Sequence, residues 1–261
     1  MEKGTREFQI YRHKGGTIQP VIDDLIEEFP LRVHLNGEEV VTLMCTPTCL
    51  EELAVGFLVS EGFIEDRDQL AGIETDDSGK GLYVFLSRNE SIDSTFVRRY
   101  LTTGCGKGSS FHDPEDAKRI QVPDRGLRVP ASVVLELMNR VEKSSELFVK
   151  TGAVHCVALC NPSGIILFRE DIGRHNALDK IIGRCFMDGI PLEDKMLFTT
   201  GRVSSEIAIK TAKFGIELLV SRSAPTALAV EIARDTGVTV VGFARGDRFN
   251  IYSHPYRVTE G

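Results

Sequence analysis

The chain has 261 residues, enough for one large domain or two smaller ones, and 42% of them are hydrophobic while 26% are charged. This composition is typical of a globular protein with a substantial core, and it excludes disordered, collagen-like and coiled-coil chains. The 31 Lys and Arg against 38 Asp and Glu give a net charge of −7, which argues against a protein that mainly binds nucleic acid through its phosphates.

The sequence predicts neither a secretion signal nor a membrane segment. The first seven residues carry mixed charge and no apolar segment, which does not fit a signal peptide. Residues 151–168 are free of charged side chains, but turn residues at 161–164 interrupt them, so two buried strands are predicted. We therefore expect a cytoplasmic protein whose six cysteines are mostly reduced. They are Cys45, Cys49, Cys105, Cys156, Cys160 and Cys185.

The first half of the chain predicts a small mixed lobe. Apolar residues at 31–35 and 40–44 flank Asn36-Gly37, which predicts a hairpin. Thr48 and Glu51 have the spacing of a capping box, followed by a helix that ends at Gly62. A strand is expected at 82–86 and a short apolar segment at 96–101, and the stretch around Cys105, which has no hydrophobic period, predicts a mobile loop.

The second half predicts a more regular α/β domain. The segment 123–126 is a connector and a helix begins near Ala131, so we divide the chain into an N-terminal α+β lobe, 1–125, and an α/β domain, 126–261. A hairpin at 154–159 and 165–169 precedes a helix for which Asn176 is the expected cap. Strands at 196–199, 217–220 and 238–242 alternate with helices at 205–214 and 226–234, which predicts parallel strands with right-handed crossovers.

Arginines follow each of these three strands. Parallel strands end at one edge of a sheet, where ligands of open α/β sheets bind, and guanidinium groups suit phosphate oxygens. The segments 199–202, 221–225 and 243–248 therefore predict an anion-binding rim. The alternative is that the arginines are solvated or pair with surface carboxylates. The four are Arg202, Arg222, Arg245 and Arg248.

Cys105 lies between Gly104 and Gly106 and is followed by Lys107. Glycines leave the sulfur accessible, and a neighbouring cation lowers a thiol pKa and so favours the reactive thiolate. A flexible-loop cysteine with no task is the alternative. A phosphate-binding P-loop is excluded, because Leu101 and Gly108 stand where that motif needs Gly and Ser or Thr.

The other cysteines are better explained as core or loop residues than as metal ligands. Cys156 and Cys160 are four apart on a predicted strand, which separates them by about 13 Å. Cys45 and Cys49 have a zinc-like spacing but no second pair at ligand spacing. Cys185 belongs to the apolar face of a helix. We expect no stoichiometric zinc.

His175 precedes a predicted helix and fits two roles equally, a catalytic base or a hydrogen-bonded structural histidine. Asp171 or Asp179 would orient it in either role. A zinc deaminase is unsupported, because Asn176-Ala177 follows the histidine where the His-x-Glu motif requires Glu, and the Pro-Cys-x-x-Cys partner motif is absent.

Taken together, these segments resemble the FdhD/NarQ family from about Glu28 to His254. The resemblance rests on Pro30-Leu31 with Asn36-Gly37, on Thr103–Gly106, Glu170–Lys180, Thr200–Glu206, Ser221–Thr226 and Phe243–Arg248. It implies a cytidine deaminase-like layered α/β/α domain without the zinc site, plus the smaller N-terminal α+β lobe, and a homodimer.

The resemblance further implies a cytoplasmic sulfur carrier, a sulfurtransferase. Such proteins take persulfide sulfur from a cysteine desulfurase and deliver it to the molybdenum cofactor, in its bis(molybdopterin guanine dinucleotide) form, for formate dehydrogenase. Cys105 matches the carrier cysteine of the family. The stretch that contacts the cofactor in the family matches Phe243, Ala244, Arg245, Gly246, Asp247 and Arg248 of this chain. The anion-binding rim predicted above adds Arg202 and Arg222 as cofactor-binding residues. Many members have a second loop cysteine where this chain has Gly108.

A different class also fits the arginine rim: a chaperone that binds the cofactor and transfers no sulfur. Only the carrier needs Cys105. A stand-alone hydrolase or deaminase is the weakest alternative, because the sequence lacks metal ligands and a recognisable nucleophile–base pair.

Overall fold

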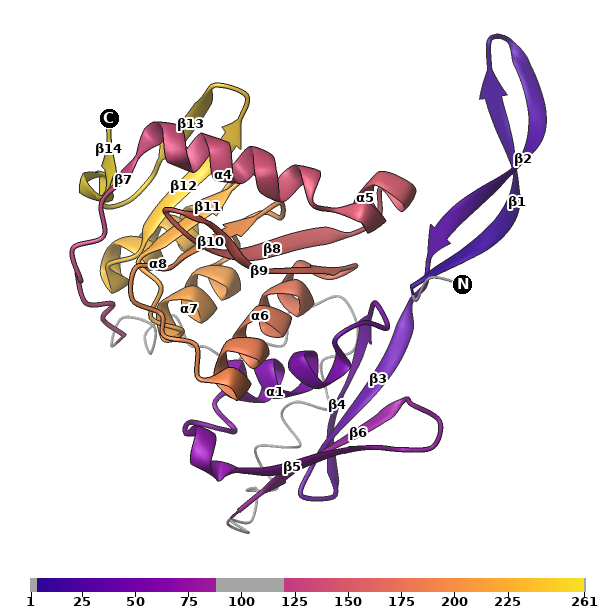
Figure 1. Ribbon diagram of the computed structural model, residues 1–261, viewed down its shortest axis with the longest axis horizontal. Helices are drawn as coiled ribbons and strands as arrows, with labels where there is room; N and C mark the ends of the chain where they lie inside the picture. The colour runs from indigo at the N-terminus through magenta and orange to yellow at the C-terminus, as the bar shows by residue number, and fades with distance from the viewer. Residues whose placement is uncertain (1–3, 88–119, 261) are drawn as a thin grey trace.

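The computed structural model describes residues 4–87 and 120–260. The predicted apolar segment at 96–101 and the Cys105 loop lie outside the described residues. The described part is a mixed α/β structure with a four-stranded and a six-stranded sheet, two small two-stranded sheets, and helices between and over them (Figure 1).

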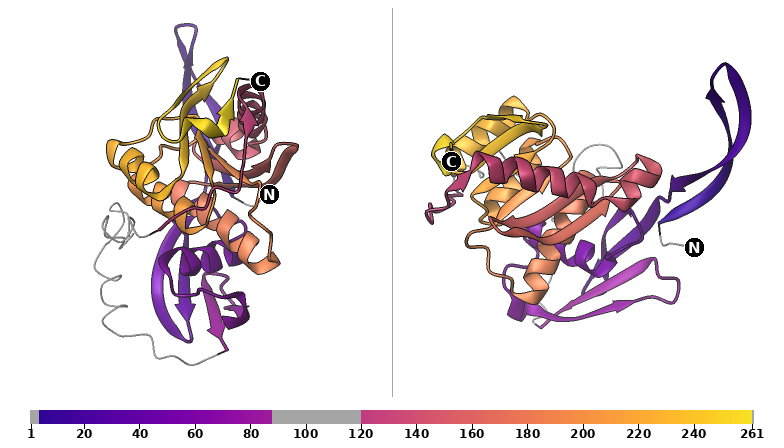
Figure 2. Two further views of the ribbon diagram at one scale, coloured as in Figure 1. Left: turned by 90° about the vertical axis from the view of Figure 1, so that its left-hand side faces the viewer. Right: turned by 45° about the horizontal axis from the view of Figure 1, so that its top comes forward.

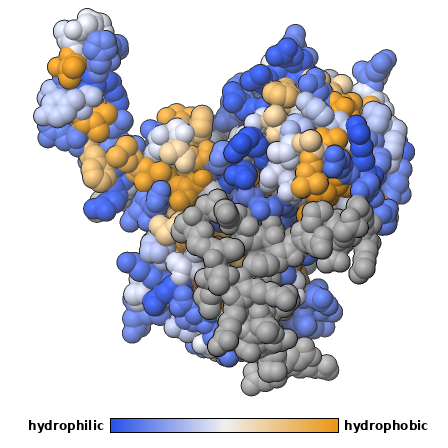
Figure 3. Space-filling model, turned by 180° about the vertical axis from the view of Figure 1, so that it is seen from behind, coloured by the Kyte–Doolittle hydropathy of each residue, from blue (hydrophilic) through white to orange (hydrophobic). Residues whose placement is uncertain are grey.

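A two-stranded arm begins the described chain. Strands β1 (Thr5–Lys14) and β2 (Thr17–Ile26) pair only with each other, through a turn at Gly15-Gly16 where both residues have positive φ. The arm extends away from both larger sheets (Figure 2), and apolar patches are visible along it (Figure 3). The sequence analysis did not predict this arm.

The smaller sheet has the strand order β4-β3-β6-β5. The predicted hairpin is confirmed as β3 (Phe29–Leu35) and β4 (Glu38–Cys45), and Asn36 and Gly37 have the positive φ of 49° and 89° that such a two-residue turn requires. The predicted strand at 82–86 is β6 (Gly81–Leu86), which runs parallel to β3 and antiparallel to β5 (Leu70–Thr75).

Helix α1 (Leu50–Glu61) packs on this sheet and ends at Gly62, as predicted. The predicted capping box is wrong. Cys49, with φ 52°, is the N-cap residue and no side chain caps the first turn. The physical reason is that the Thr48 hydroxyl is engaged elsewhere, 3.4 Å from the Nζ of buried Lys180. A single 3-10 turn, η1 (Arg67–Gln69), leads into β5.

The larger sheet has the order β13-β12-β11-β10-β8-β9. The predicted antiparallel hairpin is confirmed as β8 (His155–Asn161) and β9 (Gly164–Asp171). The three predicted parallel strands are β10 (Met196–Thr199), β11 (Leu218–Ser221) and β12 (Thr239–Arg245), and β13 (Arg248–Ile251) closes the edge. Strand β8 runs antiparallel to β10, so its beginning lies where β10 ends.

Helices cover both faces of this sheet (Figure 1). One face packs against α4 (Ala131–Lys143), and the other packs against α6 (Arg174–Asp188), α7 (Ser205–Lys213) and α8 (Ala227–Thr236). Side chains of β8 alternate between these two cores, as expected for a buried strand: Val157 and Leu159 enter one, Ala158 and Cys160 the other. The short elements are α5 (Glu146–Thr151), η2 (Pro255–Arg257), and the parallel pair β7 (Val129–Pro130) and β14 (Val258–Thr259).

Residues 120–125 pack with the larger sheet. Val122 belongs to the core beneath α7 and α8, and its N–H donates to the Thr236 carbonyl (2.8 Å). The proposed division into 1–125 and 126–261 stays a prediction. No helix in the described residues is long and apolar enough to cross a membrane.

The expected cap at Asn176 is wrong, because Gly173 is the N-cap of α6 and Asn176 lies within its first turn. The Asn176 amide instead donates to the Met44 carbonyl (2.8 Å) and the Asp171 carboxylate (2.9 Å). Asn176 therefore ties the start of α6 to the smaller sheet.

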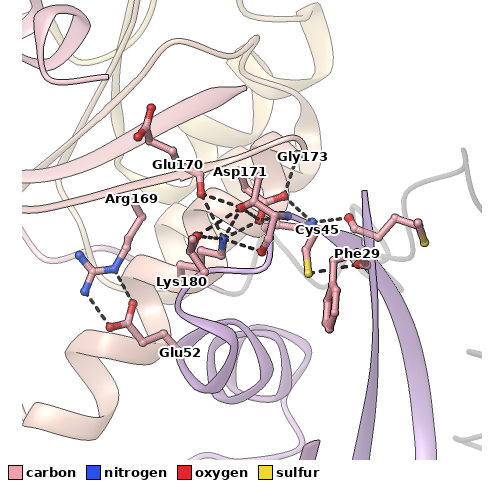
Figure 4. A network of polar contacts seen from close by, with 12 residues as sticks. Phe29, Cys45, Glu52, Arg169, Glu170, Asp171, Gly173 and Lys180 are labelled. Carbon is pink, nitrogen blue, oxygen red and sulfur yellow. Dashed lines mark hydrogen bonds and ion pairs between the residues drawn. The ribbon is translucent and has the colours of Figure 1, made fainter. Parts of the chain in front are cut away.

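Buried charges also join the two sheets (Figure 4). Lys180 of α6 pairs with Asp171 at 2.6 Å, and both side chains are fully buried. Nearby, Arg169 of β9 donates to Glu52 of α1 (2.7 Å). These contacts fix the position of the segment 171–176, which opens α6 at the edge of the larger sheet.

Candidate functional site

The loops that follow β10, β11 and β12 form one continuous edge, as the sequence predicts. The Val203 N–H donates to the Ala224 carbonyl (3.1 Å), and the Phe243 N–H donates to the Ser223 carbonyl (3.0 Å). The hydroxyl of Ser221 donates to the Gly201 carbonyl (2.7 Å). Main-chain contacts thus bring all three arginine-bearing loops together.

The arginine side chains themselves point to two different regions. Arg222 pairs with Glu142 of α4, so for this residue the structure shows the alternative of an ion pair with a surface carboxylate. Arg245, with Ala244 and Gly246, lines a hollow of about 310 Å³ against the same helix. Arg202 lies on the side where α6 begins, where burial lowers the Arg174 pKa and the charge of Arg202 lowers it further.

The segment 243–248 spans the irregular end of β12 and the beginning of β13, and Ala244 within it is buried in the core beside α4. The strand register shifts between Gly242 and Arg245, and Phe243 has a φ of 55°. Such a bulge re-aims side chains next to a sheet edge. Arg245, Gly246, Asp247 and Arg248 are all exposed, and the Arg245 guanidinium lies 5.6 Å from the Phe243 ring centroid.

His175 has a carboxylate partner that the sequence analysis did not foresee. Its Nε2 lies 2.8 Å from the Glu206 carboxylate and 3.4 Å from the Ser204 hydroxyl. The expected partners are wrong, because Asp171 is engaged by Lys180 and Asp179 by Lys210. The contact with Glu206 joins the beginnings of α6 and α7.

His155 and Arg174 complete a basic group that sequence reasoning also missed. Burial lowers the pKa of His155, and the charges of Arg174, Arg202 and His175 lower it further. Burial and the charge of Arg202 lower the pKa of Arg174. His155 opens β8, and only the antiparallel placement of β8 beside β10 brings it here. The one sequence feature that could have pointed to this basic group was that Arg174 and His175 are adjacent in the chain.

The cysteines in the described residues are poor nucleophiles. Burial raises the pKa of Cys156 to about 11 and the pKa of Cys45, Cys160 and Cys185 to about 12. Cys49 is exposed, but partial burial and the Glu52 carboxylate raise its pKa as well. Because the thiolate is the reactive form, the four buried thiols remain protonated near neutral pH, and the raised pKa of Cys49 leaves it less thiolate than a free cysteine has. Cys105 lies outside the described residues.

No three His, Cys, Asp or Glu side chains cluster as a metal site would need, within the part of the chain that the structure describes. The predicted absence of zinc stays a prediction.

Comparison with known proteins identifies the family. The model of the FdhD/NarQ family matches residues 26–259, nearly the whole chain. The chain belongs to this family. It is 40% identical over 260 residues to the sulfur carrier protein FdhD of Bacillus subtilis (strain 168), covering 99% of both chains. It is 43% identical over 256 residues to that of Listeria monocytogenes serotype 4b (strain F2365), covering 96% of this chain and 97% of the relative.

A solved structure shows the same fold. The crystal structure of a putative formate dehydrogenase accessory protein from Desulfotalea psychrophila matches with a TM-score of 0.80 at 24% identity. The match covers 98% of this chain and 100% of that one, so the likeness includes both sheets.

Proposed function

We propose that this protein is a sulfur carrier in the maturation of formate dehydrogenase and that Cys105 carries the sulfur. The observation that supports the carrier function best is the identity of 40% or more, over nearly the full length, to proteins named sulfur carrier protein FdhD. The choice of Cys105 is supported by the raised pKa values of the other five thiols, because a sulfur carrier needs an accessible thiolate.

The proposed transfer is a thiol–persulfide exchange. The Cys105 thiolate attacks the terminal sulfur of a persulfide on a cysteine desulfurase, the donor S–S bond breaks, and the desulfurase thiolate leaves. One sulfur atom moves and nothing is oxidised or reduced overall. The step needs no second thiol, so Gly108 in this chain does not prevent it.

The proposed recipient is the molybdenum cofactor in its bis(molybdopterin guanine dinucleotide) form. The segment Phe243–Arg248, through its exposed residues 245–248, would contact it, together with Arg202 and Arg222, since guanidinium groups bind phosphate oxygens through paired N–H donors. We further propose, from the family resemblance, a cytidine deaminase-like layered α/β/α fold for the domain built on the larger sheet, a homodimeric state, and action in the cytoplasm, where thiols stay reduced.

Intact-protein mass spectrometry after incubation with a cysteine desulfurase and cysteine tests the carrier. Wild type should gain the mass of one sulfur atom, and reductant should remove it. Cys105→Ala should gain none, and the matched control Cys49→Ala should behave as wild type. An adduct that forms equally well on Cys105→Ala would refute the carrier assignment and favour the cofactor-binding chaperone.

Calorimetric titration at fixed salt tests the nucleotide-binding residues. Guanosine diphosphate, which represents half of the cofactor, should bind wild type more tightly than adenosine diphosphate, with Asp247 as the candidate acceptor for guanine N–H groups. Arg248→Ala and Arg222→Ala should each lose about ten- to a hundredfold in affinity, because each removes a charge-assisted contact. The control is Arg32→Ala, an exposed arginine of the smaller sheet paired with Asp76. Unchanged affinity in both rim variants would place the nucleotide elsewhere.

A further inference from the structure

Two helices begin side by side at the edge of the larger sheet. Helix α6 starts at Arg174 and α7 at Ser205, and neither N-cap residue, Gly173 or Ser204, caps the following turn with its side chain. The His175 contacts with Ser204 and Glu206 hold the two starts together. The first N–H groups of a helix carry partial positive charge and favour anions.

Arg174 adds an unsatisfied donor to this edge. Its Nε is buried and has no hydrogen-bond partner. Leaving a charged donor unpaired away from water costs free energy, and the nearby positive charge of Arg202 increases that cost. A bound anion near these two side chains would lower the electrostatic part of this cost.

His155 and Gly201 complete the surroundings. A Cβ atom on Gly201 would lie 2.9 Å from the Arg174 Cβ and 3.6 Å from the His155 Nδ1, so the glycine allows close packing of all three residues. Two carboxylates lie close by: Asp171 pairs with Lys180, and Glu206 contacts His175 and also acts on the charge of Arg174. The two guanidinium groups therefore give the cluster an excess of positive charge in a chain that is acidic overall.

We propose that Arg174, Arg202, His155 and His175 form a second anion site, which binds a phosphate-class dianion where α6 and α7 begin. The site rests on the proposed function through Arg202, which is also proposed to contact the cofactor, whereas Arg174, His155 and His175 are not among the residues proposed for that contact. A phosphate group fits because its oxygens accept from forked guanidinium donors and from helix N–H groups together. The phosphate would come either from the free ion or from a nucleotide.

The test uses inorganic phosphate and pyrophosphate, titrated into the full-length protein at fixed ionic strength. Calorimetry gives the affinity, and the ring resonances of His155 and His175 in NMR spectra locate the binding. Arg174→Gln and Arg202→Ala should each weaken binding about tenfold or more. Arg32→Ala should bind as wild type. Thermal melting of every variant establishes that it is folded, and Arg202 is exposed, so its removal leaves the cores intact.

The outcomes separate this inference from the proposed function. Equal phosphate affinity in wild type, Arg174→Gln and Arg202→Ala, or ring resonances that do not move, would overturn the second site whether or not Cys105 carries sulfur. Phosphate binding that survives in Arg248→Ala but fails in Arg174→Gln would establish it independently of the nucleotide. Competition by guanosine diphosphate, with none by guanosine, would identify a nucleotide phosphate as the source, and the absence of competition would identify the free ion.

Discussion

Lys180 and Asp171 show how single buried charges position the candidate site. The Lys180 ammonium donates to the Thr46 hydroxyl (2.8 Å) and the Glu170 carbonyl (3.1 Å) in addition to its pair with Asp171 (Figure 4). Asp171 in turn accepts from the Gly173 N–H (2.9 Å), one residue before Arg174. The buried pair therefore holds the start of α6, and the basic cluster depends on it.

Replacing Lys180 by Met should destabilise the protein by about 3–5 kcal/mol, because it leaves the Asp171 carboxylate buried without a cation. Urea denaturation measures this change in the free energy of unfolding. Arg32→Met, which breaks the exposed pair with Asp76, should cost no more than about 1 kcal/mol. A smaller loss for Lys180→Met than for Arg32→Met would contradict the role given to the buried pair.

At the scale of elements, the crossing of α1 and α6 joins the two sheets. A Cβ atom on Gly56 would lie 1.7 Å from the Asp179 carbonyl oxygen, and one on Gly183 would lie 1.9 Å from the Glu52 carbonyl oxygen. Real Cβ atoms do not approach backbone so closely. Two glycines thus let the helix backbones touch, and any larger residue would force the helices apart.

Gly56→Ala and Gly183→Ala should each destabilise the protein by about 1–3 kcal/mol or more, since overpacking at a helix contact moves the backbone. Gly72→Ala in β5 is the matched control, because nothing lies within 4 Å of the Cβ it would add. Equilibrium unfolding of the three variants makes the comparison. Similar stabilities for all three would mean that the helices can separate without cost.

At the scale of the whole molecule, the arm stands apart from both cores. The hydrophobic clusters of the described residues contain no residue of β1 or β2. Tyr11 and Ile18 are 73% and 70% exposed. A two-stranded hairpin on its own is only marginally stable in water. The arm therefore contributes little to the stability of the sheets behind it.

Deletion of residues 5–26 should leave a protein that unfolds cooperatively, with a melting temperature close to that of wild type. The reason is that each sheet with its helices keeps its own core. Differential scanning calorimetry of the shortened and full-length chains measures this. Loss of a cooperative transition would show that the arm supports the fold.

The sequence by itself determined the elements whose signals are local. The Asn36-Gly37 turn and the alternation of strands with helices after Thr151 were predictable, because turn chemistry and hydrophobic period act between neighbouring residues. The arm escaped prediction because neither of its faces is buried in a core, so its strands show no clear apolar alternation.

Only the tertiary structure decided which side chains meet. Arg202 and Arg222 follow neighbouring strands, yet Arg222 is drawn to Glu142 on α4 while Arg202 lies near Arg174 and His155. Thr48 likewise does not cap α1, and its hydroxyl lies 3.4 Å from the Nζ of Lys180, far along the chain. Such contacts depend on strand order and on partners distant in sequence, and the free energy of a buried charge or an ion pair is decided by those partners.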